Sequence, residues 1–419
     1  MENAFIIVFG SLLFVTLYFQ VFLFVTYLEN KKIFSKKEGQ PDYAYVPFPA
    51  PLPSVTIIVP CWNEAKTIGK TILSLLALEY PKEKLRIFVV DDGSDDETAE
   101  AIAPFLQNPS VRYFHKENGG KHTALNLGIA EADTDFVGCL DADSFVAPDA
   151  LLRIVPLFEN QRVMAVTPSI KVHSPETVIQ RIQDTEYTLS IIFRKLLASI
   201  NAQYVAPGPF SIYRRSVFNT IGVFKQAHNT EDMEIALRIH AHGFAIENAF
   251  GAEVYTVAPE TLRDILKQRI RWTYGFMRNV FDYRRLLFKK QYGNLGMFSL
   301  PIAFLSIGAV LFFTSYILKN IAAYVYQKVV SVSTIGISSS LGNSHFSWFF
   351  FDTTMTTLVI YMSFVLFAVM FFISVYHARD RVLLSRGDAY FVLLYGLIAP
   401  LWMARAVVKL ASWRPIKWR

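Results

Sequence analysis

Polar residues with the types and spacing for chemistry follow three short apolar runs, at positions 55–59, 87–90 and 136–140. These residues are Pro60-Cys61-Trp62-Asn63-Glu64, Asp91-Asp92-Gly93-Ser94 and Asp141-Ala142-Asp143. Carboxylates gathered at one place repel one another unless a cation or hydrogen-bond donors offset them. An Asp-x-Asp pair suits Mg²⁺ or Mn²⁺, with the other ligand positions left to phosphate oxygens and water. A single acidic turn is usually only a turn, but three in succession predict a divalent-cation site.

A glycine pair precedes a predicted helix in Asn118-Gly119-Gly120-Lys121-His122. Glycines before a helix N-terminus let the backbone approach a phosphate closely, and Lys121 adds a positive charge. The spacing Gly-x-x-x-x-Gly-Lys-Ser/Thr of a nucleotide-binding P-loop is absent from the sequence, which argues against a kinase or an ATPase.

Two later segments carry further candidate residues. Thr230-Glu231-Asp232 opens a helix predicted to run to about His242, where the acids could simply complement the helix dipole. Gln268, Arg271 and Trp272 share one face of a helix predicted to begin near Thr261. An amide and a guanidinium can hold a diphosphate, and an indole can stack on a sugar ring. The competing interpretation of this second segment is a membrane-surface anchor, since Arg and Trp both favour that interface.

The elements that must position these residues alternate between strands and helices. The apolar runs are predicted strands, and 65–78 and 98–106 are predicted helices between them. Ser94 and Glu97 have the spacing of a capping box for the second helix. This alternation predicts an α/β fold with a mainly parallel sheet, which binds ligands at the carboxyl ends of its strands.

The composition indicates a membrane protein with a large polar part. Hydrophobic residues make up 53% and charged residues 18% of the 419 residues, and the formal net charge is +6. The basic residues flank apolar runs and form no stripe interleaved with aromatics, so we expect a membrane surface and no nucleic acid. Cys61 and Cys139 lie in apolar runs and are predicted to be buried thiols.

Four apolar segments are long enough to cross a membrane: 4–28, 295–318, 353–376 and, with Arg405 and Lys409 inside it, 389–411. The first has no basic n-region and no cleavage site, so we interpret it as a span and not a secretory signal. The predicted organisation is a span over 1–30, a cytoplasmic domain over 31–255, interfacial helices over 256–294 and a region of about three spans over 295–419. Three crossings would place the basic C-terminal tail outside, against the positive-inside tendency, unless the last segment is re-entrant.

Taken together, the ordered motifs resemble those of the processive family-2 glycosyltransferases, which have a GT-A fold. The resemblance covers residues 54–275 and rests on Asp91-Asp92, Asp141-Ala142-Asp143, Thr230-Glu231-Asp232 and Gln268-x-x-Arg271-Trp272. The single N-terminal span, the compact size and Trp413 and Trp418 in the tail look most like bacterial poly-β-1,6-N-acetylglucosamine synthases. Chitin-oligosaccharide and hyaluronan synthases are close relatives. Cellulose synthases fit less well, since their larger membrane region and C-terminal regulatory domain are missing.

The resemblance implies a role for each motif. Asp92, with Asp91 and Glu64, would contact the uridine of a UDP-sugar, and Asp141 and Asp143 would place Mg²⁺ or Mn²⁺ and the diphosphate. Asp232, beside Glu231, would be the general base of an inverting transfer. Further implied donor contacts are Pro60, Asn63, Lys121, Gln268 and Arg271. Implied acceptor contacts are Trp272 and, from Pro207-Gly208-Pro209-Phe210-Ser211, Gly208 and Phe210, although the two prolines depart from the usual glycine-rich form.

The implied enzyme polymerises N-acetylglucosamine and exports the polysaccharide from a multi-pass position in the inner membrane, with its catalytic domain in the cytoplasm. A glycan is too polar to cross lipid unaided, and the spans are few, so we expect the channel to need a second copy or a small partner subunit. The alternatives are a chitin-, hyaluronan- or glucan-type synthase, or an enzyme that adds one sugar to a lipid. A transporter or Ca²⁺-binding scaffold would carry ionisable residues inside its spans, and the clear spans hold none.

Overall fold

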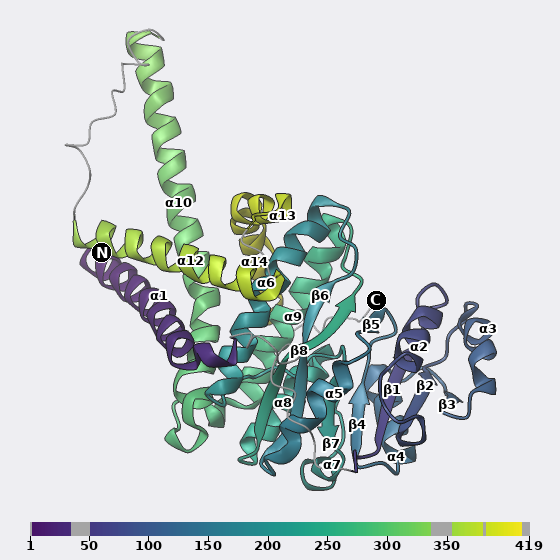
Figure 1. The fold of residues 1–419 in the computed structure, drawn as a ribbon. Coiled ribbons are helices and arrows are strands. Elements are labelled where there is room, and N and C mark those ends of the chain that lie inside the picture. Colours follow the sequence, from purple (N-terminus) through teal and green to yellow (C-terminus); the bar gives the residue numbers. More distant parts are fainter. Residues whose placement is uncertain (1, 35–50, 337–353, 380–382, 413–419) are drawn as a thin grey trace.

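The computed structural model describes residues 2–34, 51–336, 354–379 and 383–412. Within these residues an α/β domain lies beside a group of long apolar helices (Figure 1). The basic residues of the tail, Lys36 and Lys37, and Trp413 and Trp418 fall outside the described residues, so the topology expectations that rest on them stay predictions.

The core of the domain is one eight-stranded sheet in the order β3-β2-β1-β4-β7-β6-β8-β5. The first four of these strands are parallel, β7 is antiparallel to both β4 and β6, and β5 is antiparallel to β8. The strands are β1 Val55–Cys61, β2 Leu85–Asp91, β3 Val111–His115, β4 Phe136–Cys139, β5 Ser144–Val146, β6 Val163–Val172, β7 Ser211–Arg214 and β8 Ala245–Thr256.

Helices cover both faces of this sheet, and apolar helices flank it in sequence. In the domain they are α2 Ile68–Leu76, α3 Thr98–Ile102, α4 Lys121–Glu131, α5 Ala150–Ile154, α6 Val178–Ser199, α7 Ser216–Ile221, α8 Glu231–Ala241 and α9 Leu262–Asp282. Those rich in apolar residues at either end of the chain are α1 Glu2–Asn30, α10 Leu300–Ile335, α12 Met355–Arg379 and α14 Gly396–Ala411, with the short α13 Arg386–Tyr390 before the last.

The position of β1 in the interior of the sheet explains why its sequence is apolar at nearly every position. All seven of its residues are buried. Ile57 and Val59 pack into one hydrophobic cluster, and Ile58 between them packs into a second cluster on the other face of the sheet. A strand that is covered on both faces needs apolar side chains pointing both ways, which produces a continuous apolar run.

The three predicted strands and the two predicted helices between them are present, but the details differ at two places. The capping box is wrong: the hydroxyl of Ser94 donates to Asp91 instead, and α3 begins after Glu97 with no side-chain cap. The edge strand β3, which is only partly buried, was not predicted. In the sheet, the three strands that end in acidic residues, β2, β1 and β4, are direct neighbours.

Among the residues that the structure describes, four helices are long and apolar enough to cross a membrane: Phe5–Ile33, Leu295–Thr334, Met355–Arg379 and Arg386–Ala411. The N-terminal one packs against α12 and α6, while α14 packs along α9 of the domain. In Figure 1 α10 extends well beyond its neighbours, and with 36 residues it is about 54 Å long. The apolar helices are therefore built directly onto the domain through α6 and α9.

Candidate active site

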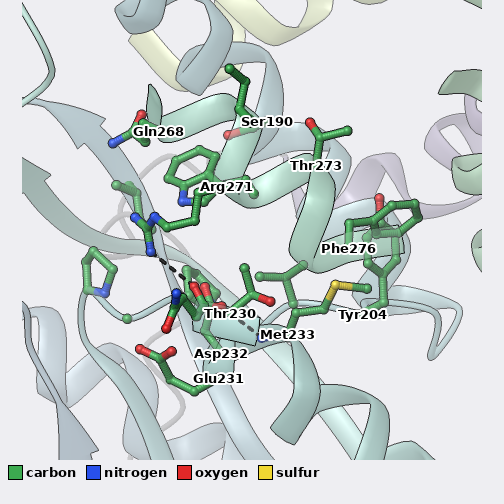
Figure 2. A pocket seen from close by; sticks show the side chains of 18 of the residues that line it. Ser190, Tyr204, Thr230, Glu231, Asp232, Met233, Gln268, Arg271, Thr273 and Phe276 are labelled. Carbon is green, nitrogen blue, oxygen red and sulfur yellow. Dashed lines mark hydrogen bonds between the residues drawn. The ribbon is translucent and has the colours of Figure 1, made fainter. Parts of the chain in front are cut away.

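A single large cavity joins the acidic edge of the sheet to the apolar helices. Its volume is about 1680 Å³, and it is lined by the ends of β1 and β4, the start of α8, one face of α9, and residues of α1, α6 and α10. Figure 2 shows the side of this cavity where Gln268 and Arg271 of α9 lie above Glu231 and Asp232 of α8. The cavity therefore extends from the acidic strand ends, which the sequence predicted as a ligand-binding edge, to the apolar helices.

Asp92 is held in place by the glycine-rich segment. The backbone N–H groups of Gly119 and Gly120 donate to its two carboxylate oxygens at 3.0 and 2.7 Å, and Lys116 Nζ lies 2.5 Å from Oδ1. Gly120 has φ +91°, a conformation that side chains disfavour and that aims its amide at the carboxylate. The glycines expected to approach a phosphate therefore bind Asp92, which keeps this buried acid at the cavity wall.

Asp91, the neighbour of Asp92 in the chain, has a separate set of hydrogen-bond partners. It is buried and accepts hydrogen bonds from Ser94 and Tyr113. Burial by itself would raise its pKa, but these hydrogen bonds and the one with His115 hold the pKa below its usual value. Asp91 does not line the cavity.

Asp141, Asp143 and Lys121 form the charged centre of the cavity. Lys121 Nζ pairs with Asp141 and lies 3.9 Å from Glu231, and these carboxylates raise the pKa of Lys121 although burial opposes it. Burial, and then the negative charges of Asp141 and Glu64, raise the pKa of Asp143 to about 7. A buried carboxylate beside two like charges is stabilised by a cation.

The residues of this charged centre have the chemistry to hold a divalent ion only with help from a ligand. In the described part of the chain no group of three or more His, Cys, Asp or Glu side chains could hold a metal by itself. The two carboxylates Asp141 and Asp143 are hard oxygen donors of the kind that Mg²⁺ and Mn²⁺ prefer. They fit an ion that takes its remaining ligands from a bound diphosphate and water.

Asp232 lies in the first turn of α8, next to Glu231, whose carboxylate is 3.9 Å from Lys121 Nζ. Burial and the adjacent charge of Glu231 raise the pKa of Asp232 to about 6, and Lys121 and Arg271 oppose this rise. The dipole of α8 would favour the ionised form at this position, so burial outweighs it here. A carboxylate with a pKa near 6 is ionised at neutral pH and is suited to accept a proton.

The predicted face of α9 also reaches the cavity. Gln268, Arg271 and Trp272 all line it, and Arg271 Nη1 donates to the carbonyl of Asn229 at 3.1 Å. The residue between them, Arg269, was not singled out by the sequence, yet its guanidinium lies 4.3 Å from the ring centre of Trp272. Its Nη2 also lies 2.7 Å from Glu186 of α6, so the orientation of the indole depends on a buried ion pair.

Most of the residues predicted from the sequence meet in this one cavity. Twelve line it: Pro60, Glu64, Asp92, Lys121, Asp141, Asp143, Gly208, Glu231, Asp232, Gln268, Arg271 and Trp272. Besides Asp91, the structure leaves out Asn63, whose amide is bonded to Asp95, and Phe210, which is fully buried in the core. The expectations of donor contact by Asn63 and of acceptor contact by Phe210 are not met by this geometry.

Helix α6 is a wall of the cavity that the sequence analysis missed. Tyr187, Ser190, Arg194 and Leu197 are spaced three or four residues apart and line the cavity from one face of this helix. Arg194 Nη1 is buried without a hydrogen-bond partner in the described part of the chain. The amphipathic pattern of 178–199 predicts a helix, but its polar residues do not follow a predicted strand, which was the signal that pointed to the acidic residues.

The end of the cavity towards the apolar helices is hydrophobic. It is lined mainly by aliphatic and aromatic side chains, among them Leu12, Val15 and Phe19 of α1, Ile302 and Leu305 of α10, and Met403 of α14. The cavity is therefore amphipathic, with charged groups at the sheet and hydrocarbon at the other end.

The family model described as glycosyl transferase family 2 matches residues 56–222, which contain β1 to β7 and both acidic pairs. Residues 56–222 are a family-2 glycosyltransferase domain. The chain also resembles the poly-beta-1,6-N-acetyl-D-glucosamine synthase of Staphylococcus aureus (strain COL), with 33% identity over 227 residues. The synthase of Staphylococcus epidermidis is 32% identical over 224 residues. These alignments cover 54% and 53% of this chain and span about half of each relative, 55% and 54% of its length.

The fold of this glycosyltransferase domain and its flanking helices also matches a solved structure. A mannosyltransferase from Pyrobaculum calidifontis, in complex with GDP-Man and Mn²⁺, covers 98% of this chain and 99% of its own with a TM-score of 0.61 and 18% identity. At this identity the likeness establishes the fold alone. The domain has the mixed α/β GT-A fold, and long apolar helices flank it on both sides.

Proposed function

We propose that this chain is an inverting glycosyltransferase that transfers N-acetylglucosamine from UDP-N-acetylglucosamine to a growing β-1,6-linked polysaccharide. The observation that carries the proposal is the single cavity in which the Asp-x-Asp pair, the carboxylate of Asp232 and the face of α9 meet. The sugar and the linkage follow the printed names of the synthases with which the chain aligns.

In this proposal the donor lies along the edge of the sheet. Pro60, Glu64 and Asp92 line the uridine end, and Asp141 and Asp143 hold Mg²⁺ or Mn²⁺. The ion would neutralise the diphosphate as its bond to the sugar breaks. Lys121 pairs with Asp141 and can turn to a phosphate oxygen, and Gln268 and Arg271 close the site from α9.

Asp232 is the proposed general base. The acceptor hydroxyl oxygen attacks the anomeric carbon as the bond from that carbon to UDP breaks, and Asp232 takes the proton of the hydroxyl. Attack from the face opposite the leaving group converts an α-linked donor into a β-linked product. Trp272, held by Arg269, offers the ring on which the acceptor sugar stacks.

The apolar end of the cavity favours a second candidate function, which is transfer of a single sugar to a lipid acceptor. Leu12, Phe19 and Ile302 offer no hydrogen bonds to a glycan, whereas they suit a hydrocarbon chain. The proposed polymerase would need polar groups from a partner subunit or a second copy to line its exit path. Either candidate places the chain in the inner membrane with its catalytic domain in the cytoplasm.

The test is to express the chain in membranes and to supply labelled UDP-N-acetylglucosamine with Mn²⁺ or Mg²⁺. We expect polymer that resists chitinase and hyaluronidase, and a large fall in its rate of formation, to a small residual rate, in Asp143→Asn and Asp232→Asn. Asp149→Asn is the matched control, because Asp149 pairs with Arg153 at the start of α5, outside the cavity. A labelled lipid with one sugar would favour the second candidate, and polymer from another donor would overturn the sugar assignment. No product from any sugar donor would contradict the proposed activity.

A further inference from the structure

The segment that leads into α8 has an unusual backbone conformation. Ala227, His228 and Asn229 have φ angles of +44°, +58° and +61°, so three successive residues other than glycine occupy the left-handed region. Residues of this kind visit that region singly, and a run of three persists only where the surrounding structure holds it. The segment ends at Thr230, two residues before Asp232.

One face of α9 holds this segment. Arg271, Gly275, Asn279 and Asp282 are spaced four, four and three residues apart, which places them in one row along the helix. Arg271 Nη1 donates to the carbonyl of Asn229 at 3.1 Å, and Asp282 Oδ2 lies 2.8 Å from His228 Nε2. The buried Asn279 donates from Nδ2 to Thr230 Oγ1 at 2.8 Å.

Gly275 lets α9 approach this closely. A Cβ atom at position 275 would lie 2.3 Å from Thr230 Oγ1, 2.4 Å from its Cγ2 and 2.9 Å from its Cβ. Distances below 3.0 Å require a neighbour to move, and the Thr230 backbone is continuous with the first turn of α8. A side chain at position 275 would therefore push on the turn that carries Asp232.

We propose that Gly275 and Asn279 are positioning residues for Asp232, acting through Thr230 and the left-handed segment Ala227–Asn229. The proposal rests on the proposed function, since it takes Asp232 as the base. Neither residue lines the cavity, so neither acts by touching the donor or the acceptor. Because Arg271 of the same row does line it, α9 links the place where the diphosphate would bind to the position of the base.

The first test is Gly275→Ala, with Gly69→Ala of α2 as the matched control. Gly69 is also helical, but the nearest atom to an added Cβ there lies at 3.7 Å, an ordinary contact. We expect Gly275→Ala to lower kcat by about 10- to 100-fold, because a misplacement near 1 Å costs rates of that order. The KM for UDP-N-acetylglucosamine and the affinity for UDP should change by less than about twofold, since only the base is displaced. A rise in KM without a fall in kcat would overturn the proposal.

A second substitution that makes room for the added methyl group tests whether its contact with Thr230 causes the fall in kcat. Thr230→Ala removes the two atoms nearest to the added methyl group, and it also removes the acceptor of the Asn279 hydrogen bond. The double variant Gly275→Ala/Thr230→Ala should therefore be more active than Gly275→Ala alone and about as active as Thr230→Ala alone. A double variant no more active than Gly275→Ala would contradict transmission through Thr230.

Asn279→Ala removes the hydrogen bond to Thr230, and Asn248→Ala is its control. Asn248 is equally buried and bonds Thr167, outside the cavity, so both variants lose a buried amide and a similar amount of stability. We expect only Asn279→Ala to lower kcat when thermal unfolding shows that both proteins are folded. Equal kcat values for the two variants would overturn the role of Asn279.

The background Asp232→Asn separates this proposal from the proposed function. With the base removed, its position no longer matters, so Gly275→Ala should cost less than about twofold in the residual rate. If Gly275→Ala lowered the rate in the Asp232→Asn background by the same factor as in the wild type, Gly275 would act by another route. If Asp232→Asn retained full activity, the base itself would be wrongly assigned. If Asp232→Asn were inactive while Gly275→Ala behaved as wild type, only the positioning role would fail.

Discussion

At the scale of single residues, the neighbours of Asp232 determine the pKa of its carboxyl group. Burial and Glu231 raise its pKa to about 6, so this carboxyl group is ionised above that pH and protonated below it. Glu231 lies one residue away and contributes a like charge that can be removed without touching Asp232.

We expect kcat to fall as the pH falls through about 6, because protonated Asp232 cannot accept a proton. Glu231→Gln should move this acidic limb to lower pH, since removal of a negative charge stabilises ionised Asp232. The measurement is kcat between pH 5 and 8 at saturating donor, with buffers of constant ionic strength. An acidic limb that stays in place in the variant would rule out Asp232 as the group that titrates.

The raised pKa of Asp143, about 7, also predicts an effect on stability. In the unfolded chain this carboxyl would ionise near pH 4, so between pH 4 and 7 the unfolded state releases a proton that the folded state retains. The carboxylate therefore destabilises the fold progressively over this range, and fully above it. Asp143→Asn should melt at a higher temperature than wild type at pH 8, with the difference vanishing near pH 4.

Mn²⁺ should reverse that order, because it neutralises the carboxylates in the wild type. The expected result in a thermal melt is a rise with Mn²⁺ for the wild type and a smaller rise for Asp143→Asn. An equal rise in melting temperature in both proteins would show that the ion does not bind at Asp143.

The sequence predicted the chemical residues better than it predicted their partners. Carboxylates after apolar strands are visible as a pattern, so Asp92, Asp141 and Asp143 could be named. The partners of Asp92 come from Lys116 and the glycine amides, some twenty-five residues away, and no local pattern reveals such contacts. The expectation that Phe210 contacts the acceptor is not met, because a sequence motif does not give the direction of a side chain, and the side chain of Phe210 is buried in the core.

At the scale of elements, α6 and α9 are coupled by a buried ion pair. Arg269 of α9 bonds Glu186 of α6 at 2.7 Å, and Tyr395 of the π-helical turn η10 (Phe391–Tyr395) donates to the same carboxylate at 3.1 Å. Helix periodicity predicted α9 and its cavity face. It could not predict this pair, because the two helices are far apart in sequence and the contact depends on how they cross.

Glu186→Ala should lower the stability by about 3 kcal/mol, because it leaves the buried guanidinium of Arg269 without its charge partner. Glu186→Gln keeps one acceptor oxygen for Arg269, and its amide N–H can donate to the Tyr395 hydroxyl, so this variant should cost less. The control is Glu253→Ala, which breaks a more exposed pair with Lys171 worth less than about 1 kcal/mol. Thermal unfolding in detergent measures all three, and equal shifts for Glu186→Ala and Glu253→Ala would contradict the assignment.

At the scale of the whole molecule, the domain between residues 51 and 290 is preceded by one apolar helix and followed by three in the part of the chain that the structure describes. Lys31 and Lys32 follow the first of these helices. Basic residues next to a span favour the cytoplasmic side, which is the basis for placing the domain there.

Protease treatment of oriented membrane vesicles tests this placement. The exposed turn around Arg284 and Arg285 should be cleaved by trypsin in inside-out vesicles and protected in right-side-out vesicles. A periplasmic marker protein serves as the control for sealing. Cleavage in right-side-out vesicles alone would reverse the topology and remove the cytoplasmic UDP-sugar pool as the donor source.

The packing of α9 has one more consequence. Ile270, Tyr274 and Met277 of this helix pack against Trp402 and its neighbours on α14, while the row through Gly275 and Asn279 bears on the segment before Asp232. Spans adjust their tilt to the thickness of the bilayer, and α10 is far longer than the roughly 30 Å hydrocarbon layer. We therefore expect the activity to depend on the acyl-chain length of the surrounding bilayer, because a change in the tilt of α14 would reach the segment before Asp232 through α9.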